Sequence, residues 1–169
     1  MPGVNSGASL NQAILGSSSD FEIRPISVAD ALPLRQKLLR PHQTLENLVH
    51  PDDDAPDSLH VGAFLDGQLV GVASVSRSSP PGEVDQNVWQ LRSIATVPEM
   101  RRAGCGAALA CACITHVAAH GGTALWCNGR TSALAFYRAL GFQTRGEEFQ
   151  VPYTGPHYVM WRRVYPHER

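Results

Sequence analysis

The chain reads Arg101-Arg102-Ala103-Gly104-Cys105-Gly106 at the junction between an extended apolar run, residues 89–97, and an alanine-rich helical run, residues 107–119. Glycines at a strand-to-helix junction allow a tight turn and let backbone N–H groups approach a ligand closely. The helix start adds unsatisfied donors and a positive dipole end, which favour a phosphate. The two arginines add bidentate positive charge. The same residues also fit a simple turn with solvated arginines, because one Gly-x-Gly is a weak signal.

The composition is that of an ordinary globular protein. The 169 residues, of which 43% are hydrophobic, are enough for one hydrophobic core and few for two. The formal net charge is -1, so the basic excess expected of a nucleic-acid-binding protein is missing. No apolar run approaches the length of a membrane-spanning helix. We therefore expect a soluble, cytoplasmic protein that binds neither nucleic acid nor membranes.

The start of the chain differs in composition from the rest. Residues 1–20 are dominated by Gly, Ser, Asn and Ala, and they lack the cationic start and apolar core of a secretory signal. We expect a flexible N-terminal tail over residues 1–20 and one ordered domain over residues 21–169.

Hydrophobic periodicity beyond this tail predicts alternating strands and helices. Ser27 is the expected cap and Pro41 the expected end of the first helix, and Asp66-Gly67 is a strong hairpin signal. The predicted strands are residues 21–26, 60–65, 68–77, 89–97, 123–127, 143–151 and 157–164. The predicted helices are residues 28–40, 42–50, 107–119 and 131–140. This order indicates an α/β protein with a mixed sheet of about seven strands, covered by about four helices.

The cysteine pattern predicts neither a disulfide nor a metal site. The four cysteines are Cys105, Cys111, Cys113 and Cys127, and none has C-x-x-C spacing. Cys111 and Cys113 are two positions apart, so on a helix they point to different sides. Cys127, at the end of a predicted strand, is either a reactive thiol or, as is more usual, a small buried packing residue.

Two motifs together resemble the GCN5-related N-acetyltransferase (GNAT) family. The first, Arg101-x-x-Gly104-x-Gly106 after a strand ending at Val97-Pro98, is similar to the family's acyl-CoA motif. The second reads Ala133-Leu134-Ala135-Phe136-Tyr137-Arg138-Ala139-Leu140-Gly141-Phe142 and is similar to the family's aromatic-Tyr helix ending in Leu-Gly-Phe. Both occur in the family's order and in the right element types. The resemblance covers residues 21–164 and implies a GNAT-like fold with a splayed central sheet.

The resemblance implies acetyl-CoA as the cosubstrate, without a metal. The strand whose backbone hydrogen-bonds the pantetheine arm matches Ile94, Ala95 and Thr96. The segment that holds the pyrophosphate through main-chain N–H groups matches Arg101, Arg102, Ala103, Gly104, Cys105, Gly106 and Ala107. Tyr137 matches the tyrosine that usually protonates the departing thiolate, and a phenol with an ordinary pKa of about 10 can donate at neutral pH. The alternative role for Tyr137 is a core aromatic.

Two positions depart from the family pattern. Many members carry an asparagine seven residues before the tyrosine, and this chain has Arg130 there. Asn128 could substitute only with a shifted loop, whereas Arg130 could reach a CoA phosphate or an acidic part of the acceptor. Ala103 occupies a position where Arg, Lys or Gly is common in the family. We expect this difference to affect CoA binding little, because backbone groups do most of the binding.

The sequence gives fewer signals for the residues that would bind the acceptor amine, which we call the acceptor side. Glu147, Glu148 and His157 belong to the last predicted strand pair, which borders the acceptor cleft in this family. Transfer to an amine needs a group that takes a proton from the ammonium form. Strand residues alternate between faces, so only one of the two glutamates can point inward. Our candidates are Glu148 and His157, the latter because histidines titrate nearest neutral pH; a surface role is the alternative for each.

Two further acidic segments could contribute to the acceptor side. Glu46 belongs to the part of the chain that usually forms the acceptor wall in this family. Asp57 and the acidic run of residues 52–54 either attract a cationic amine or form a solvated loop.

We expect an N-acetyltransferase that moves the acetyl group of acetyl-CoA to a primary amine, on a small molecule or a peptide. The amine would attack directly in a ternary complex, with no covalent intermediate, and the resemblance also makes a homodimer possible. One alternative is a CoA-binding regulatory module without turnover, against which the intact Tyr137 argues. Another is a nucleotide-binding protein, but Ala107-Ala108 replace the P-loop Lys and Ser/Thr, and Leu109 replaces the third dinucleotide-site glycine.

Overall fold

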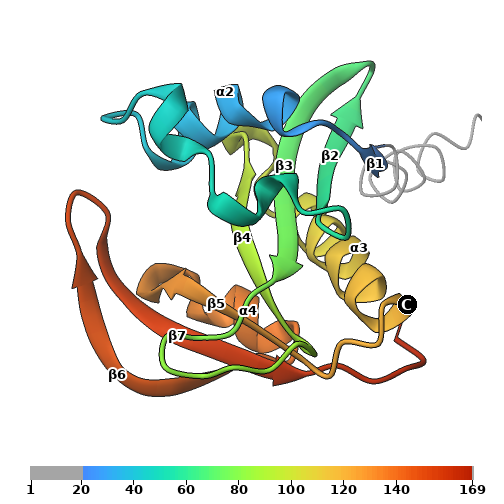
Figure 1. Ribbon diagram of the computed structural model, residues 1–169. Coiled ribbons are helices and arrows are strands. Elements are labelled where there is room, and N and C mark those ends of the chain that lie inside the picture. Colours follow the sequence, from blue (N-terminus) through green and yellow to red (C-terminus); the bar gives the residue numbers. More distant parts are fainter. Residues whose placement is uncertain (1–20, 169) are drawn as a thin grey trace, which may run out of the picture.

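A seven-stranded mixed sheet forms the centre of the computed structural model, which describes residues 21–168 (Figure 1). The strand order is β1-β2-β3-β4-β5-β7-β6, and only the β4–β5 pair is parallel. The strands are β1 (Glu22–Pro25), β2 (Leu59–Leu65), β3 (Gln68–Arg77), β4 (Val88–Thr96), β5 (Ala124–Arg130), β6 (Gln143–Val151) and β7 (Gly155–Arg163). The mixed sheet and its strand count are thus confirmed. The expected tail, residues 1–20, lies outside the described residues.

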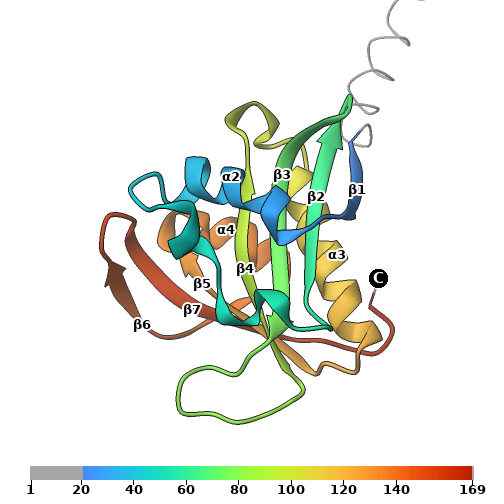
Figure 2. The same ribbon diagram turned by 45° about the horizontal axis from the view of Figure 1, so that its top comes forward.

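The helices cover both faces of this sheet. Those of the described residues are α2 (Val28–Leu39), α3 (Cys105–Ala119) and α4 (Leu134–Ala139). Val72 packs in the cluster under α2, whereas its neighbour Ala73 packs in the cluster under α3. Successive strand residues point to opposite faces, so α2 and α3 lie on opposite sides of β3 (Figure 2). Within residues 21–168, no helix is long and apolar enough to cross a membrane.

Local signals set several boundaries as expected. The Ser27 hydroxyl accepts a hydrogen bond from the amide of Asp30 and caps α2. Asp66 and Gly67 have φ values of 50° and 81°, the two positive values that a tight hairpin turn needs, and they join β2 to β3. Four α3 side chains at the helical spacing i, i+3, i+4 and i+7 are all buried: Ala110, Cys113, Ile114 and Val117.

The predicted helix over residues 42–50 is wrong. Only a single 3-10 turn forms there, η1 (Leu45–Leu48). Pro41 and Pro51 bracket the segment, and the residue before each proline is disfavoured in helical geometry. Leu48 is buried, but Leu45 and Val49 remain exposed, so the segment does not bury the face that an amphipathic helix would. Three α-helices rather than four therefore cover the sheet in the described part of the chain.

Short 3-10 turns also replace other expected conformations. The predicted loop over residues 51–58 begins with the turn η2 (Pro51–Asp54). A further turn, η3 (Pro98–Met100), connects β4 to the segment that precedes α3. The helix predicted over residues 131–140 starts as η4 (Thr131–Ala133) before α4.

The sheet opens between β4 and β5. These strands pair only from Val88 with Ala124 to Gln90 with Trp126, and in Figure 1 their arrows diverge beyond this point. On its other edge β4 stays paired with β3 up to Thr96, with a register shift near Ser93, whose φ is +56°. This irregularity bends β4 away from β5. The splayed sheet implied by the family resemblance is therefore present.

Candidate active site

A cavity of about 630 Å³ occupies the opening between β4 and β5. One wall is the edge of β4 from Gln90 to Thr96, and the opposite wall is β5 from Trp126 to Arg130. Helix α2 and the η1 turn close the cavity on the side of the sheet that α2 covers. This volume falls in the range of small-molecule sites. The lining includes most of the expected site residues: Ile94, Ala95, Thr96, Arg101, Asn128, Arg130, Tyr137 and His157.

The start of α3 supplies backbone donors next to this cavity. Gly104 has a φ of 82°, which favours glycine, and it caps the helix from a left-handed conformation. Among residues 21–168, no hydrogen-bond partner is found for the amide N–H groups of Gly104, Cys105, Gly106 and Ala107. Such free donors at a helix N-terminus form an anion-binding site.

The side chains of this segment have different surroundings. Arg101 lines the cavity, and Arg102, whose φ is +65°, is exposed. Ala103 packs against the main core. Cys105 is fully buried, and burial raises the pKa of its thiol. The cysteine side chain therefore packs in the core, and only its amide is available to a ligand.

Tyr137 on α4 is buried and lines the cavity. Its ring packs edge-on against Phe136 and Phe142, with ring centroids 5.1 and 5.6 Å away. A Cβ atom at Gly129 would lie 2.9 Å from Tyr137 Cε2, so this close approach of helix to strand requires glycine. Burial raises the pKa of Tyr137 well above its ordinary value, and neighbouring Cys127 adds to this, so the phenol holds its proton.

Cys127 also lines the cavity, but it does not have the properties of a reactive thiol. The side chain is buried, and burial raises the pKa of its thiol to about 12. A thiol attacks as the thiolate, so this cysteine is inert near neutral pH. All four cysteines are free, and no cluster of three His, Cys, Asp or Glu residues suited to a metal occurs among residues 21–168.

His157 on β7 is buried and faces the cavity from the strand next to β5. Its Nδ1 atom lies 2.8 Å from the carbonyl oxygen of Gly155. A carbonyl oxygen only accepts, so Nδ1 carries the proton in this contact, and Nε2 of the neutral ring has a free lone pair. His157 can therefore accept a proton inside the cavity that Tyr137 also lines.

The structure does not bring the expected glutamates into the cavity. Glu147 and Glu148 are both exposed, and the Glu148 carboxylate accepts a hydrogen bond from Thr131 Oγ1. The two residues lie where the β6–β7 register shifts, between Arg145 and Phe149. Because this bulge breaks the strand alternation, the expected alternation of the two glutamates between the faces of the sheet does not apply here. Glu46 is likewise exposed.

Arg130 on β5 lines the cavity and contacts the end of α2. One of its Nη atoms donates a hydrogen bond of 3.3 Å to the carbonyl oxygen of Leu39 at the end of α2. Arg40 is close by, and burial together with the charge of Arg130 lowers its pKa. Asn128, two positions before Arg130, lines the cavity but is solvent-exposed. At the position where many family members carry the amide side chain of asparagine, this chain thus has the cationic side chain of Arg130.

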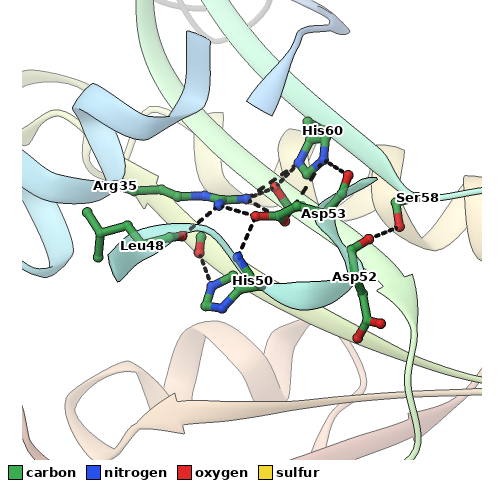
Figure 3. A network of polar contacts seen from close by, with 9 residues as sticks. Arg35, Leu48, His50, Asp52, Asp53, Ser58 and His60 are labelled. Carbon is green, nitrogen blue, oxygen red and sulfur yellow. Dashed lines mark hydrogen bonds and ion pairs between the residues drawn. The ribbon is translucent and has the colours of Figure 1, made fainter. Parts of the chain in front are cut away.

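A buried polar network holds the α2 side of the cavity in place (Figure 3). Arg35 makes two hydrogen bonds to the Asp53 carboxylate, at 2.8 and 3.2 Å, and further ones to the Leu48 carbonyl and Ser74 Oγ. Asp53 also accepts a hydrogen bond from the His50 amide. Burial alone would raise the pKa of Asp53, but Arg35 and the His50 amide outweigh burial and lower it.

This network corrects the two expectations for Asp53, whereas Asp54 of the same acidic run is exposed. Asp53 is buried and neutralised by Arg35, so it neither attracts an amine nor forms a solvated loop. Asp57 forms an ion pair with Arg77. Neither these two nor any other carboxylate of the described residues lines the cavity.

Sequence reasoning missed several residues of the acceptor side. Arg40, His50, Arg92 and Ser93 line the cavity, and His50 Nε2 lies 3.5 Å from Ser93 Oγ. Burial and the charges of Arg92, Arg35 and Arg40 lower the pKa of His50 to about 4. The available signal was the polar run within the apolar strand 89–97, where Arg92 and Ser93 interrupt an otherwise buried pattern.

Comparisons with known proteins identify the family of this chain. Residues 28–142 match the model of the acetyltransferase (GNAT) family. The chain is 36% identical over 144 residues to YitI of Bacillus subtilis (strain 168), described as an uncharacterized N-acetyltransferase; the match covers 85% of this chain and 97% of YitI.

Solved structures share the fold at lower identity. Ard1 from Thermoplasma volcanium superposes with a TM-score of 0.70 at 21% identity, covering 86% of this chain and 98% of that one. The ribosomal-protein-S18-alanine N-acetyltransferase from Escherichia coli superposes with a TM-score of 0.69 at 19% identity, covering 86% and 94%. The family match includes α2, β4, β5 and α4, which line the cavity, but ends before β7, which contributes His157. The chain therefore belongs to the acetyltransferase (GNAT) family and is an acyltransferase.

Proposed function

We propose that this protein transfers the acetyl group of acetyl-CoA to a primary amine by direct attack in a ternary complex. One observation carries the proposal. The opening between β4 and β5 lies beside the free amides of α3, and it is lined by a buried, protonated tyrosine and a histidine with an available lone pair. These are the groups that thioester aminolysis needs: an anion site, an acid and a base.

Backbone groups would hold the cosubstrate. The β5-facing edge of β4 has no strand partner beyond Gln90, so Ile94, Ala95 and Thr96 can offer peptide groups to the amides of a pantetheine arm. The N–H groups from Gly104 to Ala107 would hold the pyrophosphate. Arg101 adds a positive charge between these two segments.

Side chains would move the protons. As the acceptor nitrogen forms the new C–N bond and the thioester C–S bond breaks, Tyr137 gives its phenolic proton to the sulfur. His157 Nε2 takes the proton that the nitrogen loses, and solvent then restores both groups. His50 is the weaker candidate for this base, because its pKa of about 4 leaves it with little affinity for a proton. Glu148 could act only if its strand moved, because it is exposed.

Calorimetry with CoA, ATP and NAD, titrated separately, tests the anion site. We expect CoA to bind, and ATP and NAD to bind at least about 10-fold more weakly, because only CoA carries an arm for the β4 edge as well as phosphates for α3. Binding of NAD or ATP equal to that of CoA would contradict the proposal. A second assay follows free thiol release from acetyl-CoA with a panel of amines. Tight CoA binding without thiol release for any amine would instead indicate a regulatory module.

The alkaline pH profile tests the proton on Tyr137. An ordinary tyrosine would be half-ionised at about pH 10. Because burial raises the pKa of Tyr137, its acid form persists to higher pH. We therefore expect kcat/KM to stay level through about pH 10 once the acceptor is deprotonated, with circular dichroism confirming that the protein remains folded. A decline centred at about pH 10, and lost in Tyr137→Phe, would contradict a raised pKa.

A further inference from the structure

Apart from Cys127 and Tyr137, whose raised pKa values keep them protonated and neutral, the ionisable groups that line the cavity are all basic. They comprise five arginines and two histidines: Arg35, Arg40, Arg92, Arg101, Arg130, His50 and His157. Asp53 neutralises Arg35. The other four arginines form no ion pair with a carboxylate of the described residues. A cavity of this kind attracts anions and repels a purely cationic amine.

Two of these arginines lie at opposite ends of the β4 edge. Arg101 follows η3 and precedes the free amides of α3, so the phosphates of CoA account for it. Arg92 lies two residues after Gln90, where β4 and β5 last pair, and so at the far end of the opening. If the pantetheine arm of acetyl-CoA runs from the α3 amides along β4, its thioester lies toward this end of the opening. Arg92 is therefore on the acceptor side.

The guanidinium of Arg92 is only partly satisfied. One Nη atom donates to Gln90 Oε1 at 2.5 Å, whereas Nε is buried with no hydrogen-bond partner among the described residues. Asp52 and Asp53 are near enough to influence the pKa of Arg92, which burial lowers, but neither pairs with it. An arginine with unused donors suits a planar bidentate anion such as a carboxylate.

The region around Arg92 has a net positive character. His50 lies between α2 and β4, next to Ser93. The charges of Arg92, Arg35 and Arg40 each lower the pKa of His50, and that of Asp53 only partly offsets them. A free anion at this place would be stabilised by several groups together.

We propose that the acceptor is a small amine that carries a carboxylate, such as an amino acid, and that Arg92 binds this carboxylate. This inference rests on the proposed acetyl transfer. Arg40 would add to the attraction from the end of α2, and the amine would face Tyr137 and His157 across the cavity. The cavity of about 630 Å³ must also hold the end of the pantetheine arm, which restricts the acceptor to a small molecule.

Matched acceptor pairs test this inference. Each amino acid is assayed beside its carboxamide, which keeps the amine and side chain, and aspartate and glutamate are assayed beside asparagine and glutamine. We expect the best carboxylate acceptor to exceed its amide in kcat/KM by about 10-fold or more, the effect of one charge-assisted pair. Arg92→Gln should raise the acceptor KM and bring this ratio close to one. Arg92→Lys should retain part of the preference for the carboxylate acceptor over its amide, because lysine keeps the positive charge but lacks the paired N–H donors of the guanidinium.

Two controls separate the possible outcomes. Arg145→Gln, at an exposed arginine on β6 that does not line the cavity, should leave the ratio unchanged. Calorimetry of the amino acid binding to CoA-loaded protein repeats the comparison without turnover, and binding should be lost in Arg92→Gln.

A preference for neutral or cationic amines, or an Arg92→Gln effect on acetyl-CoA KM alone, would overturn the inference while leaving acetyl transfer intact. Absence of CoA binding would instead overturn the proposed function.

Discussion

Replacing Tyr137 with phenylalanine should lower kcat by about 100-fold or more, the usual contribution of a positioned general acid. The substitution keeps the ring that packs against Phe136 and Phe142, and it removes only the phenolic proton. Binding of acetyl-CoA should change little, because the backbone of β4 and the amides of α3 hold the cosubstrate. Steady-state kinetics with the best acceptor of the amine panel measures kcat, and calorimetry measures binding.

A donor with a better leaving group distinguishes an acid from a packing residue. An acetyl thioester of a more acidic thiol needs no proton on its sulfur, so Tyr137→Phe should lose much less activity with that donor than with acetyl-CoA. Tyr158→Phe provides the matched control, since Tyr158 lies on β7 outside the cavity lining. An equal loss with both donors, or unchanged activity with acetyl-CoA, would remove the acid role from Tyr137.

Replacing Arg35 with methionine should reduce the free energy of unfolding by about 3–5 kcal/mol, the usual cost of leaving a buried charge unpaired. Asp53 would lose its ion pair, and Ser74 Oγ and the Leu48 carbonyl would lose a donor. The contribution of the Arg35–Asp53 pair to the free energy of unfolding depends on pH, because folding lowers the pKa of Asp53. The Arg35–Asp53 pair therefore stabilises the protein above about pH 4, and its contribution is lost as the pH falls through the folded-state value.

Urea unfolding measures this effect against a surface pair. Arg145 and Glu83 form an ion pair with side chains that are 54% and 43% exposed, so Arg145→Met should cost less than about 1 kcal/mol. We expect the difference between wild type and Arg35→Met to narrow at acid pH, where Asp53 becomes protonated in both proteins. A loss for Arg35→Met no larger than that for Arg145→Met would show that the network does not stabilise the α2 side of the cavity.

The residues proposed to bind the cosubstrate could be named from the sequence because they are close together along the chain. The α3 amides depend on Gly104, and Tyr137 belongs to one helix with a recognisable ending. Backbone recognition needs only a turn, a helix start and an unpaired strand edge, and each of these follows from short-range sequence patterns. The same locality explains why the Ser27 cap and the turn at Asp66 and Gly67 were predicted correctly.

The side chains proposed to face the acceptor could not be predicted because they come from distant segments. Arg40, His50, Arg92 and His157 come from α2, the segment after η1, β4 and β7. Glu148 is exposed at the bulge in β6, and the long-range pair between Arg35 and Asp53 buries one carboxylate of a segment that was predicted to be a loop. No spacing in the sequence encodes either event.

The sequence by itself determined the family, the succession of strands, three of the four predicted helices, and the backbone features that suit a phosphate, since short-range periodicity and glycine positions govern them. Only the tertiary structure decided the charge of the acceptor cavity. Contacts between residues as far apart as Arg35 and Asp53 decide which arginines are neutralised and which remain free to bind a substrate. Electrostatic character of this kind arises from packing and burial rather than from composition, and the overall charge of -1 gives no sign of it.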